Sequence, residues 1–248
     1  DVASNIRAVM KEKMPKRRIV TKLGLQSKVV ITMTLFLLLS GTLGYFILEY
    51  NNPATMGDMN VFEKFMASAF QSVTTRTAGF ATVSQAALTE SSRLLGCVLM
   101  FIGGSPGGTA GGIKTTTMAM VLLTVLCVLR GKRDTECFGR RIEMDVVRSA
   151  ITILIITFTF WLCGVAALTI FEPGKDVLNL MYEASSAMGT VGLSADLTPY
   201  LTRGSHVVLM ILMYVGRIGP MTMALVFAGR ANKSAQFREL PEKRVMIG

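Results

Sequence analysis

The stretch Thr74-Thr75-Arg76-Thr77-Ala78-Gly79-Phe80 decides the fold of this chain, together with its counterpart Ala187-Met188-Gly189-Thr190-Val191-Gly192-Leu193. Each stretch combines Thr, a small or apolar residue and Gly, follows a short amphipathic segment and lies between long apolar segments. The glycines that end the Thr-x-Gly runs are 113 residues apart, as are their threonines and a second pair, Gly103 and Gly216. A spacing shared over this length indicates an internal duplication.

Both stretches have the composition of a loop that enters a membrane and leaves by the same face. A short helix brings the chain in and an extended segment returns it, so that carbonyls at membrane depth lack helical partners; this is tolerated only where they face water or an ion. Glycine allows the backbone angles that point successive carbonyls at one axis. Potassium-channel filters use a Thr-Val-Gly segment in this way. Thr190-Val191-Gly192 matches that segment, and Thr77-Ala78-Gly79 differs by one side chain.

The composition also predicts a membrane protein. The 248 residues are 51% hydrophobic and 17% charged, with a mean hydropathy of +0.49, whereas soluble proteins are about 25% charged. The net charge of +10 would suit a nucleic-acid binder, but no basic face alternates with exposed aromatic residues as single-strand binding requires. The basic residues lie between the apolar runs instead, so we expect a lipid bilayer and no nucleic acid as the partner.

The apolar runs divide the chain into two helix–pore loop–helix units in an all-α polytopic membrane fold. We expect spans over Val29–Leu48, Ser91–Leu129, Val146–Phe171 and Gly204–Gly229, since about 20 apolar residues cross a bilayer as a helix. Two shorter segments, 61–73 and 177–188, are predicted as pore helices. The predicted organisation is a linker over 1–28, a first unit over 29–129, a connection over 130–145, a second unit over 146–229 and a tail over 230–248. The chain begins with Asp1 and carries no signal-peptide pattern, so we expect a fragment of a longer protein.

A glycine-rich break interrupts the second span at residues 103–112. Six glycines and Pro106 fall within these ten residues, and glycine and proline on this scale end a helix. Broken segments at membrane depth are typical of transport pathways. A simple kink or close helix packing is the alternative, because small residues also let helices approach.

The distribution of basic residues predicts the orientation. Of the 26 Lys and Arg residues, 19 lie in the amino-terminal stretch, the 130–148 region and the carboxy-terminal tail. By the positive-inside rule these three regions are cytoplasmic. Four crossings then place both termini inside and both Thr-x-Gly runs towards the outer side of the cell membrane.

In these motifs the chain resembles the Trk/Ktr/HKT superfamily of potassium transporters. The resemblance rests on both Thr-x-Gly stretches, the break ending in Gly111-Gly112-Ile113-Lys114, and Gly216-Arg217-Ile218-Gly219-Pro220. It covers essentially the whole chain and is strongest to the carboxy-terminal half of the bacterial Ktr-type membrane subunit. In that superfamily four helix–pore loop–helix repeats of one polypeptide surround a single pore, and this sequence resembles the third and fourth.

The resemblance implies a function and site residues. It implies potassium uptake through a selectivity filter of backbone carbonyls supplied by Thr77, Ala78, Gly79, Thr190, Val191 and Gly192. It implies a gate beneath the filter, formed by the glycine-rich loop and the arginine of the last helix: Gly103, Gly104, Gly107, Gly108, Gly111, Gly112, Lys114 and Arg217. Implied partners are the missing amino-terminal half, a second copy in a homodimer and a cytoplasmic ring of nucleotide-binding (RCK-type) regulatory subunits. Potassium would be the substrate and sodium a coupling or activating ion, with no cofactor in this bacterial plasma-membrane protein.

Other readings of the same residues remain open. The chain could be a sodium-coupled cation symporter, or a membrane scaffold that anchors cytoplasmic subunits without transporting ions. Two further charges have alternative roles: Arg76 would turn away from the cation path to pair with a pore-helix acid or the loop, and Glu183 would orient the filter or pair with an arginine. Lys114 could instead extend to the cytoplasmic surface.

We expect no enzyme activity and no catalytic residue. Residues 107–115 superficially resemble a phosphate-binding loop, but Ile113 separates Gly112 from Lys114 and no strand precedes the glycines. The four cysteines, Cys97, Cys127, Cys137 and Cys163, lack the spacing of metal ligands. The single histidine, His206, begins a span and is read as interfacial.

Overall fold

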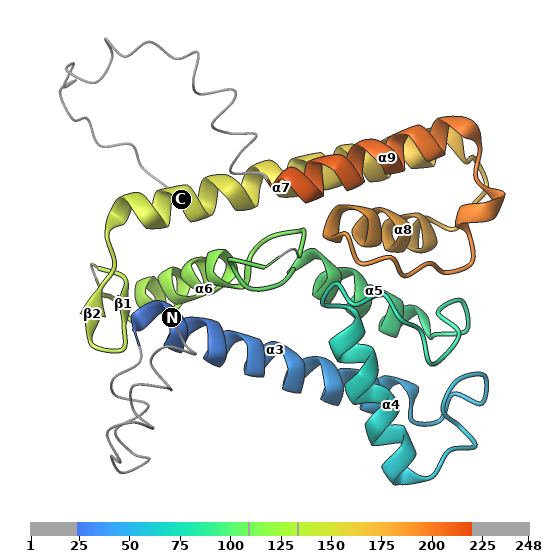
Figure 1. Cartoon of the computed structure of the whole chain (residues 1–248), viewed down its shortest axis with the longest axis horizontal. Helices are drawn as coiled ribbons and strands as arrows, with labels where there is room; N and C mark the ends of the chain where they lie inside the picture. The colour runs from blue at the N-terminus through green and yellow to red at the C-terminus, as the bar shows by residue number, and fades with distance from the viewer. Residues whose placement is uncertain (1–23, 109, 133, 220–248) are drawn as a thin grey trace.

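The computed structural model describes residues 24–219 except residues 109 and 133, and it is almost entirely helical (Figure 1). Its helices are α3 (Leu25–Glu49), α4 (Val61–Thr74), α5 (Glu90–Phe101), α6 (Thr115–Leu129), α7 (Met144–Phe171), α8 (Val177–Gly189) and α9 (Arg203–Ile218), with a 3-10 turn at Thr198–Tyr200. The prediction of an all-α fold missed one feature. Two strands, β1 (Glu136–Cys137) and β2 (Arg140–Arg141), form a small antiparallel hairpin within the predicted connection.

The long helices lie where uncharged apolar runs predicted them. α3 has 25 residues and α7 has 28, and each is long and apolar enough to cross a membrane. The predicted span over 91–129 is two separate helices, α5 and α6, which flank the glycine-rich break. The predicted span over 204–229 is described only in part: α9 ends at Ile218, and residues 220–229 lie outside the described residues, as do the predicted linker up to residue 23 and the tail.

A threonine begins the helix that follows each Thr-x-Gly stretch. Thr89 and Thr202 cap α5 and α9 by accepting a hydrogen bond from the backbone N–H of the serine three residues further on, at 3.3 and 3.4 Å. The Glu49 carboxylate accepts from the Thr89 N–H and hydroxyl at 2.9 and 2.8 Å. Glu172 likewise accepts from the Thr202 N–H at 2.6 Å and the Ser205 hydroxyl at 2.7 Å, and these bonds lower the pKa of its carboxyl. One carboxylate therefore ties the end of each long helix to the start of the second α-helix after it.

The two units meet through α5 and α8, which lie side by side at the centre of Figure 1. Cys97 and Met100 of α5 form a buried cluster with Tyr182 of α8 and with Val191, just beyond α8. Gly96 permits this approach, since a Cβ there would lie 3.0 Å from the Tyr182 ring. The second contact between the units is α6 against α7.

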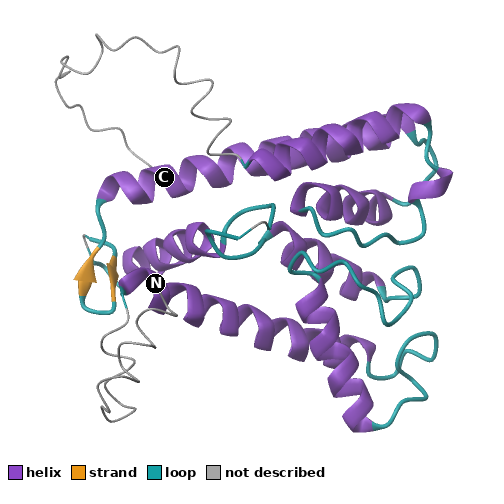
Figure 2. Ribbon diagram, in the orientation of Figure 1, coloured by secondary structure: helices purple, strands orange, loops and turns teal. Residues whose placement is uncertain are grey.

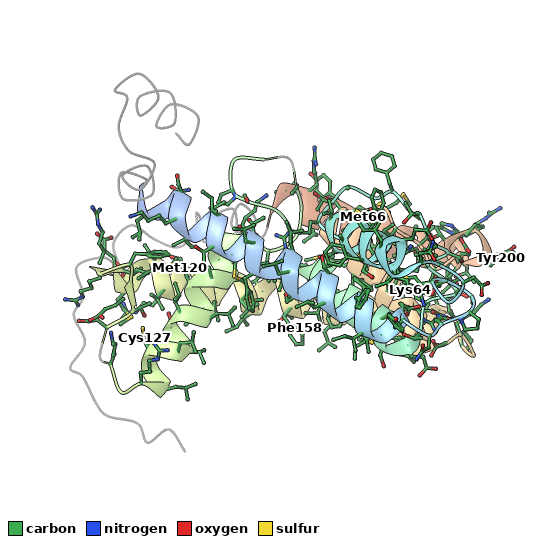
Figure 3. All side chains as sticks on the ribbon, turned by 90° about the horizontal axis from the view of Figure 1, so that it is seen from below. Lys64, Met66, Met120, Cys127, Phe158 and Tyr200 are labelled. Carbon is green, nitrogen blue, oxygen red and sulfur yellow. The ribbon has the colours of Figure 1, made fainter. Side chains whose placement is uncertain are left out.

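The hairpin and the loops around α4 lie at opposite ends of the molecule (Figure 2). In the perpendicular view, Lys64 and Tyr200 both lie towards one end of the molecule and Cys127 lies towards the other (Figure 3). Both Thr-x-Gly stretches begin at the carboxyl ends of the short helices α4 and α8, between these two ends.

Candidate functional site

The first Thr-x-Gly run leaves the end of α4 with an unusual backbone. Thr77 has φ 70° and Gly79 has φ 78°, both in the left-handed region, which a β-branched residue enters only when its surroundings enforce it. The carbonyl of Thr74 accepts from the N–H groups of Ala78 and Gly79 at 3.2 and 3.3 Å. The Thr74 hydroxyl donates to the Phe80 carbonyl at 2.5 Å, which fixes both ends of the run to the end of α4.

The second run repeats this backbone. Thr190 has φ 52° and Gly192 has φ 92°. The two threonines of the runs therefore share the left-handed conformation, and so do the two glycines that end them. Ser186 of α8 holds the run, because its carbonyl accepts from the Val191 N–H at 2.9 Å and its hydroxyl accepts from the Gly192 N–H at 3.2 Å. The internal duplication read from the sequence thus extends to backbone geometry.

The two runs touch each other. A Cβ placed on Gly79 would lie 2.3 Å from the carbonyl oxygen of Val191. Only a residue without a side chain fits there. Both the positive φ at this position and the contact with Val191 therefore require glycine. Two runs separated by more than a hundred positions in the sequence therefore lie in direct main-chain contact.

Neutral side chains hold the segment that follows the first run. Gln71 of α4 donates to the Gln85 side-chain carbonyl at 2.6 Å, Tyr182 donates to the same oxygen at 2.8 Å, and Gln85 donates to the Val83 carbonyl at 2.7 Å. All three polar side chains are buried. The sequence analysis did not identify this network; the available signal was two glutamines near a run in a mostly apolar region.

A carboxylate supports the second run. Glu183 of α8 accepts from the Ser194 hydroxyl at 2.6 Å, the Ala195 N–H at 3.0 Å and the Thr198 hydroxyl at 2.8 Å. Of the two roles considered for Glu183, this arrangement corresponds to the first, since it fixes the segment that leaves the run. No ion pair to Arg76 or Arg203 is found within the described part of the chain.

The glycine-rich break is a closed loop with a narrow neck. Ile102 and Ile113 form an isolated parallel bridge, in which the Ile113 N–H donates to the Phe101 carbonyl at 3.2 Å. The Thr115 N–H donates to the Gly104 carbonyl at 3.2 Å. A Cβ on Gly103 would lie 1.9 Å from the carbonyl oxygen of Gly111, so the two ends of the loop lie in direct contact.

The other glycines of the predicted gate also have defined positions along this loop. Gly107 and Gly112 have φ 90° and 67°, where glycine avoids strain, and a Cβ on Gly104 would lie 2.6 Å from the Ala110 methyl group. Gly108 lies in the exposed bend after Gly107.

The loop contacts both Thr-x-Gly runs. The Gly111 N–H donates to the Thr190 hydroxyl at 3.0 Å, and Arg76 donates from Nη2 to the Gly103 carbonyl at 2.9 Å. Lys114 donates from Nζ to the Ala110 carbonyl within the loop. The structure therefore joins the residues predicted as filter and those predicted as gate into one contiguous site.

Arg217 lies in the last turn of α9 and lines a cavity of about 690 Å³. The same cavity is lined by Thr190, Val191, Gly192 and Glu183. α9 approaches because its glycine leaves room: a Cβ on Gly216 would lie 2.0 Å from the Met188 carbonyl oxygen. The guanidinium of Arg217 and the second run thus line the same cavity.

Among the described residues, no group of three or more His, Cys, Asp or Glu is arranged to hold a metal ion. Each of the four cysteines is a free thiol, with Cys97, Cys127 and Cys137 buried and Cys163 exposed. The polar groups of the site are main-chain carbonyls and N–H groups, hydroxyls, the Glu183 carboxylate and the cationic side chains of Arg76, Lys114 and Arg217.

Known proteins resemble this chain over nearly its whole length. The profile of the family described as "TrkH: Cation transport protein" matches residues 11–237. "Ktr system potassium uptake protein B" of Bacillus subtilis is 37% identical over 97% of this chain and 53% of its own length. "Potassium/sodium uptake protein NtpJ" of Enterococcus hirae is 35% identical over 92% of this chain and 51% of its own length.

A solved structure shares the fold. The potassium transporter TrkH from Vibrio parahaemolyticus superposes with a TM-score of 0.63, covering 83% of this chain and 44% of that chain, at 19% identity. The chain spans about half the length of the curated relatives that it matches. Because the family profile matches most of its residues, this chain belongs to the TrkH family of cation transport proteins.

Proposed function

We propose that this chain supplies half of a potassium-selective pore, with the two Thr-x-Gly runs as half of its filter. The observation that carries the proposal is the contact between Gly79 and the Val191 carbonyl, which brings the first run directly against a main-chain oxygen of the second. Rings of carbonyl oxygens replace the hydration shell of potassium. The ion-binding residues are Thr77, Ala78, Gly79, Thr190, Val191 and Gly192.

The glycine-rich loop is the proposed gate. Its ends contact the two filter runs, and two main-chain hydrogen bonds close its neck among the described residues, so the loop can move without unfolding α5 or α6. Lys114 and Arg217 would bias its position electrostatically. A cation that passes the filter would meet this loop and two positive charges, which favours a closed resting state.

The other half of the pore is proposed to come from the amino-terminal half of the same transporter. Matches to about half the length of the relatives support this view. So does α4, which leaves apolar side chains exposed: Val61, Phe62, Phe65, Met66, Phe70 and Val73. An apolar face of this extent marks a site of protein or membrane contact.

We further propose a multi-pass protein of the bacterial plasma membrane, with both termini cytoplasmic, that forms a homodimer and binds a cytoplasmic RCK-type ring. Three of the relatives are named as parts of a "Ktr system", which supports a multi-component assembly. The basic hairpin offers a contact surface, since Arg140 and Arg141 are exposed. No cofactor is needed for this function.

Tracer flux tests the proposal directly. Rubidium and sodium uptake would be measured in liposomes that contain this chain alone, or this chain co-expressed with the amino-terminal half of a relative. Rubidium-selective uptake that Gly192→Asp abolishes is the expected result, because a charged side chain there would obstruct the carbonyls. Absence of rubidium flux under both conditions would refute the pore and favour a scaffold.

Sodium coupling is a second candidate, favoured by one observation. A relative is named as a potassium/sodium uptake protein. If sodium drives transport, rubidium uptake should depend on an inward sodium gradient. Uptake that follows the rubidium gradient alone would exclude coupling and leave a gated channel.

A further inference from the structure

Arg76 stands apart from the other charges of the site. It belongs to the first Thr-x-Gly run, is half-buried, and directs its Nη2 group to the Gly103 carbonyl at 2.9 Å. Its Nη1 group is buried without a hydrogen-bond partner, and no carboxylate lies within ion-pair distance of it among the described residues. A charged group at this depth is costly unless it has a role, and its contact is with the loop.

The opposite end of the loop is attached to the other run. The Gly111 N–H donates to the Thr190 hydroxyl at 3.0 Å, and a Cβ on Gly111 would lie 2.4 Å from that hydroxyl oxygen. Because Gly103 and Gly111 touch each other, the two attachments act on one neck. Each run therefore holds one end of the loop.

We propose that Arg76 is a positioning residue that couples the loop to the filter. Its guanidinium holds the first end of the loop against the first run, while Thr190 holds the second end against the second run. Charge-assisted hydrogen bonds are about twice as strong as neutral ones, so Arg76 is the stronger of the two attachments. The inference rests on the proposed function, in which this loop is the gate.

The coupling has a mechanical consequence. Displacement of the loop must break the Arg76–Gly103 bond, the Gly111–Thr190 bond, or both. Each bond ends on a residue next to or within an ion-binding run, so a change in the loop is transmitted to the filter. By reciprocity, a filter that is ordered by bound ions also favours the attached loop.

Hydrogen–deuterium exchange of the full chain in nanodiscs tests the attachment without requiring transport. The reporting amides are those of Gly111, Ile113 and Thr115, which close the neck. Arg76→Gln should accelerate their exchange roughly tenfold, since loss of one charge-assisted hydrogen bond is of that order. Arg76→Lys, which keeps the charge and a donor, should restore part of the protection.

Arg93 provides a matched control. It is also a half-buried arginine, it donates from Nη1 to the Asn179 side chain, and its Nε is buried without a partner, but it does not contact the loop. Arg93→Gln should leave the three amides as protected as in the parent chain. Equal acceleration by Arg93→Gln and Arg76→Gln would mean general loosening and would overturn the proposal.

A double substitution tests whether the two attachments act together. Thr190→Val removes the hydroxyl acceptor and preserves the shape of the side chain. If both attachments hold one neck, Arg76→Gln combined with Thr190→Val should accelerate exchange by clearly less than the product of the single effects. Multiplicative effects would show independent contacts and contradict coupling.

Rubidium flux then separates this inference from the proposed function. If the parent chain conducts, alone or with an upstream half, Arg76→Gln should raise basal flux severalfold and lower the rubidium-to-sodium ratio. Faster exchange with no flux in any variant would support the attachment and refute the pore. Unchanged exchange in Arg76→Gln refutes the attachment whatever the flux.

Discussion

In the first unit, the segment after the Thr-x-Gly run is held by the uncharged side chains of Gln71, Gln85 and Tyr182, whereas in the second unit Glu183 holds the corresponding segment through Ser194 and its neighbours. The backbones of the two runs nevertheless both have positive φ at the Thr and at the Gly. The two runs thus share their conformation but not the side chains that hold the segments after them. Backbone geometry is the common requirement, which is what carbonyl coordination would need.

The helices that follow the Thr-x-Gly runs, α5 and α9, differ more between the two units. α5 ends at Phe101 and gives way to the loop, whereas α9 continues through Gly216, the residue 113 positions after Gly103. Both glycines are needed for close contact, with the Gly111 carbonyl in one unit and the Met188 carbonyl in the other. Glycines at the same 113-residue spacing therefore serve a loop neck in the first unit and helix packing in the second.

Alanine at the two run glycines should give the largest difference between the units. Alanine in the left-handed region costs about 1–2 kcal/mol, and this strain applies to both Gly79→Ala and Gly192→Ala. At Gly79 the new Cβ would also collide with the Val191 carbonyl, whereas at Gly192 nothing lies within 4 Å. We expect Gly79→Ala to abolish rubidium flux and Gly192→Ala to reduce it roughly tenfold. Equal effects would show that the contact between the runs is unimportant.

The two carboxylate ties should also differ. Glu49 is fully buried and accepts four hydrogen bonds, from Asn52, Thr55 and twice from Thr89. Glu49→Gln replaces one acceptor oxygen by a donor group, so we expect a loss of about 2 kcal/mol of unfolding free energy. Glu172→Gln, with two such bonds, should lower the melting temperature in detergent by less.

The exposed Glu143 serves as the control for this comparison. Glu143→Gln should leave the melting temperature unchanged, since surface substitutions usually have small effects. A larger shift for Glu172→Gln than for Glu49→Gln would show that the number of accepted hydrogen bonds does not set the strength of the tie.

These carboxylate ties illustrate what the sequence could reveal. Thr89 and Thr202 keep the 113-residue spacing, but Glu49 and Glu172 are 123 residues apart. A search at one fixed spacing therefore finds the caps and misses their acceptors, because the turn after each long helix has a different length. Apolar runs and glycines, in contrast, predicted the helices and the loop, since they act through local backbone preferences.

The support behind the first run escaped prediction for another reason. Tyr182 and Gln85 are 97 positions apart and meet only because α5 packs against α8. The short hairpin was missed because strands of two residues carry no periodic pattern. Contacts that depend on packing between elements could be read only from the three-dimensional structure.

Removal of the Tyr182 hydroxyl should have a moderate effect that is confined to the first run. Tyr182→Phe preserves the ring and removes one buried hydrogen bond, which costs about 1 kcal/mol. We expect a lower rubidium-to-sodium flux ratio with little change in total protein stability. Ser185→Ala is the control, because its hydroxyl lies on the same helix and contacts Trp161 rather than Gln85. A similar change in selectivity for both variants would contradict a specific role of the Gln71–Gln85–Tyr182 network.

The pH dependence of the second tie should be the smallest effect. The Thr202 N–H, the Ser205 hydroxyl and further contacts lower the pKa of the Glu172 carboxyl below its ordinary value of 4.5. A carboxyl whose pKa is lower in the folded protein stabilises the fold above the unfolded pKa, and this contribution is lost as the pH falls through the folded pKa. The difference in melting temperature between the parent chain and Glu172→Gln should therefore be constant near neutral pH and shrink below about pH 4.5. Other carboxyls titrate in both proteins, so only the difference reports on Glu172. A difference in melting temperature that is undiminished at about pH 3 would show that the tie does not depend on the charge of Glu172. The ties of the two units would then differ in geometry alone.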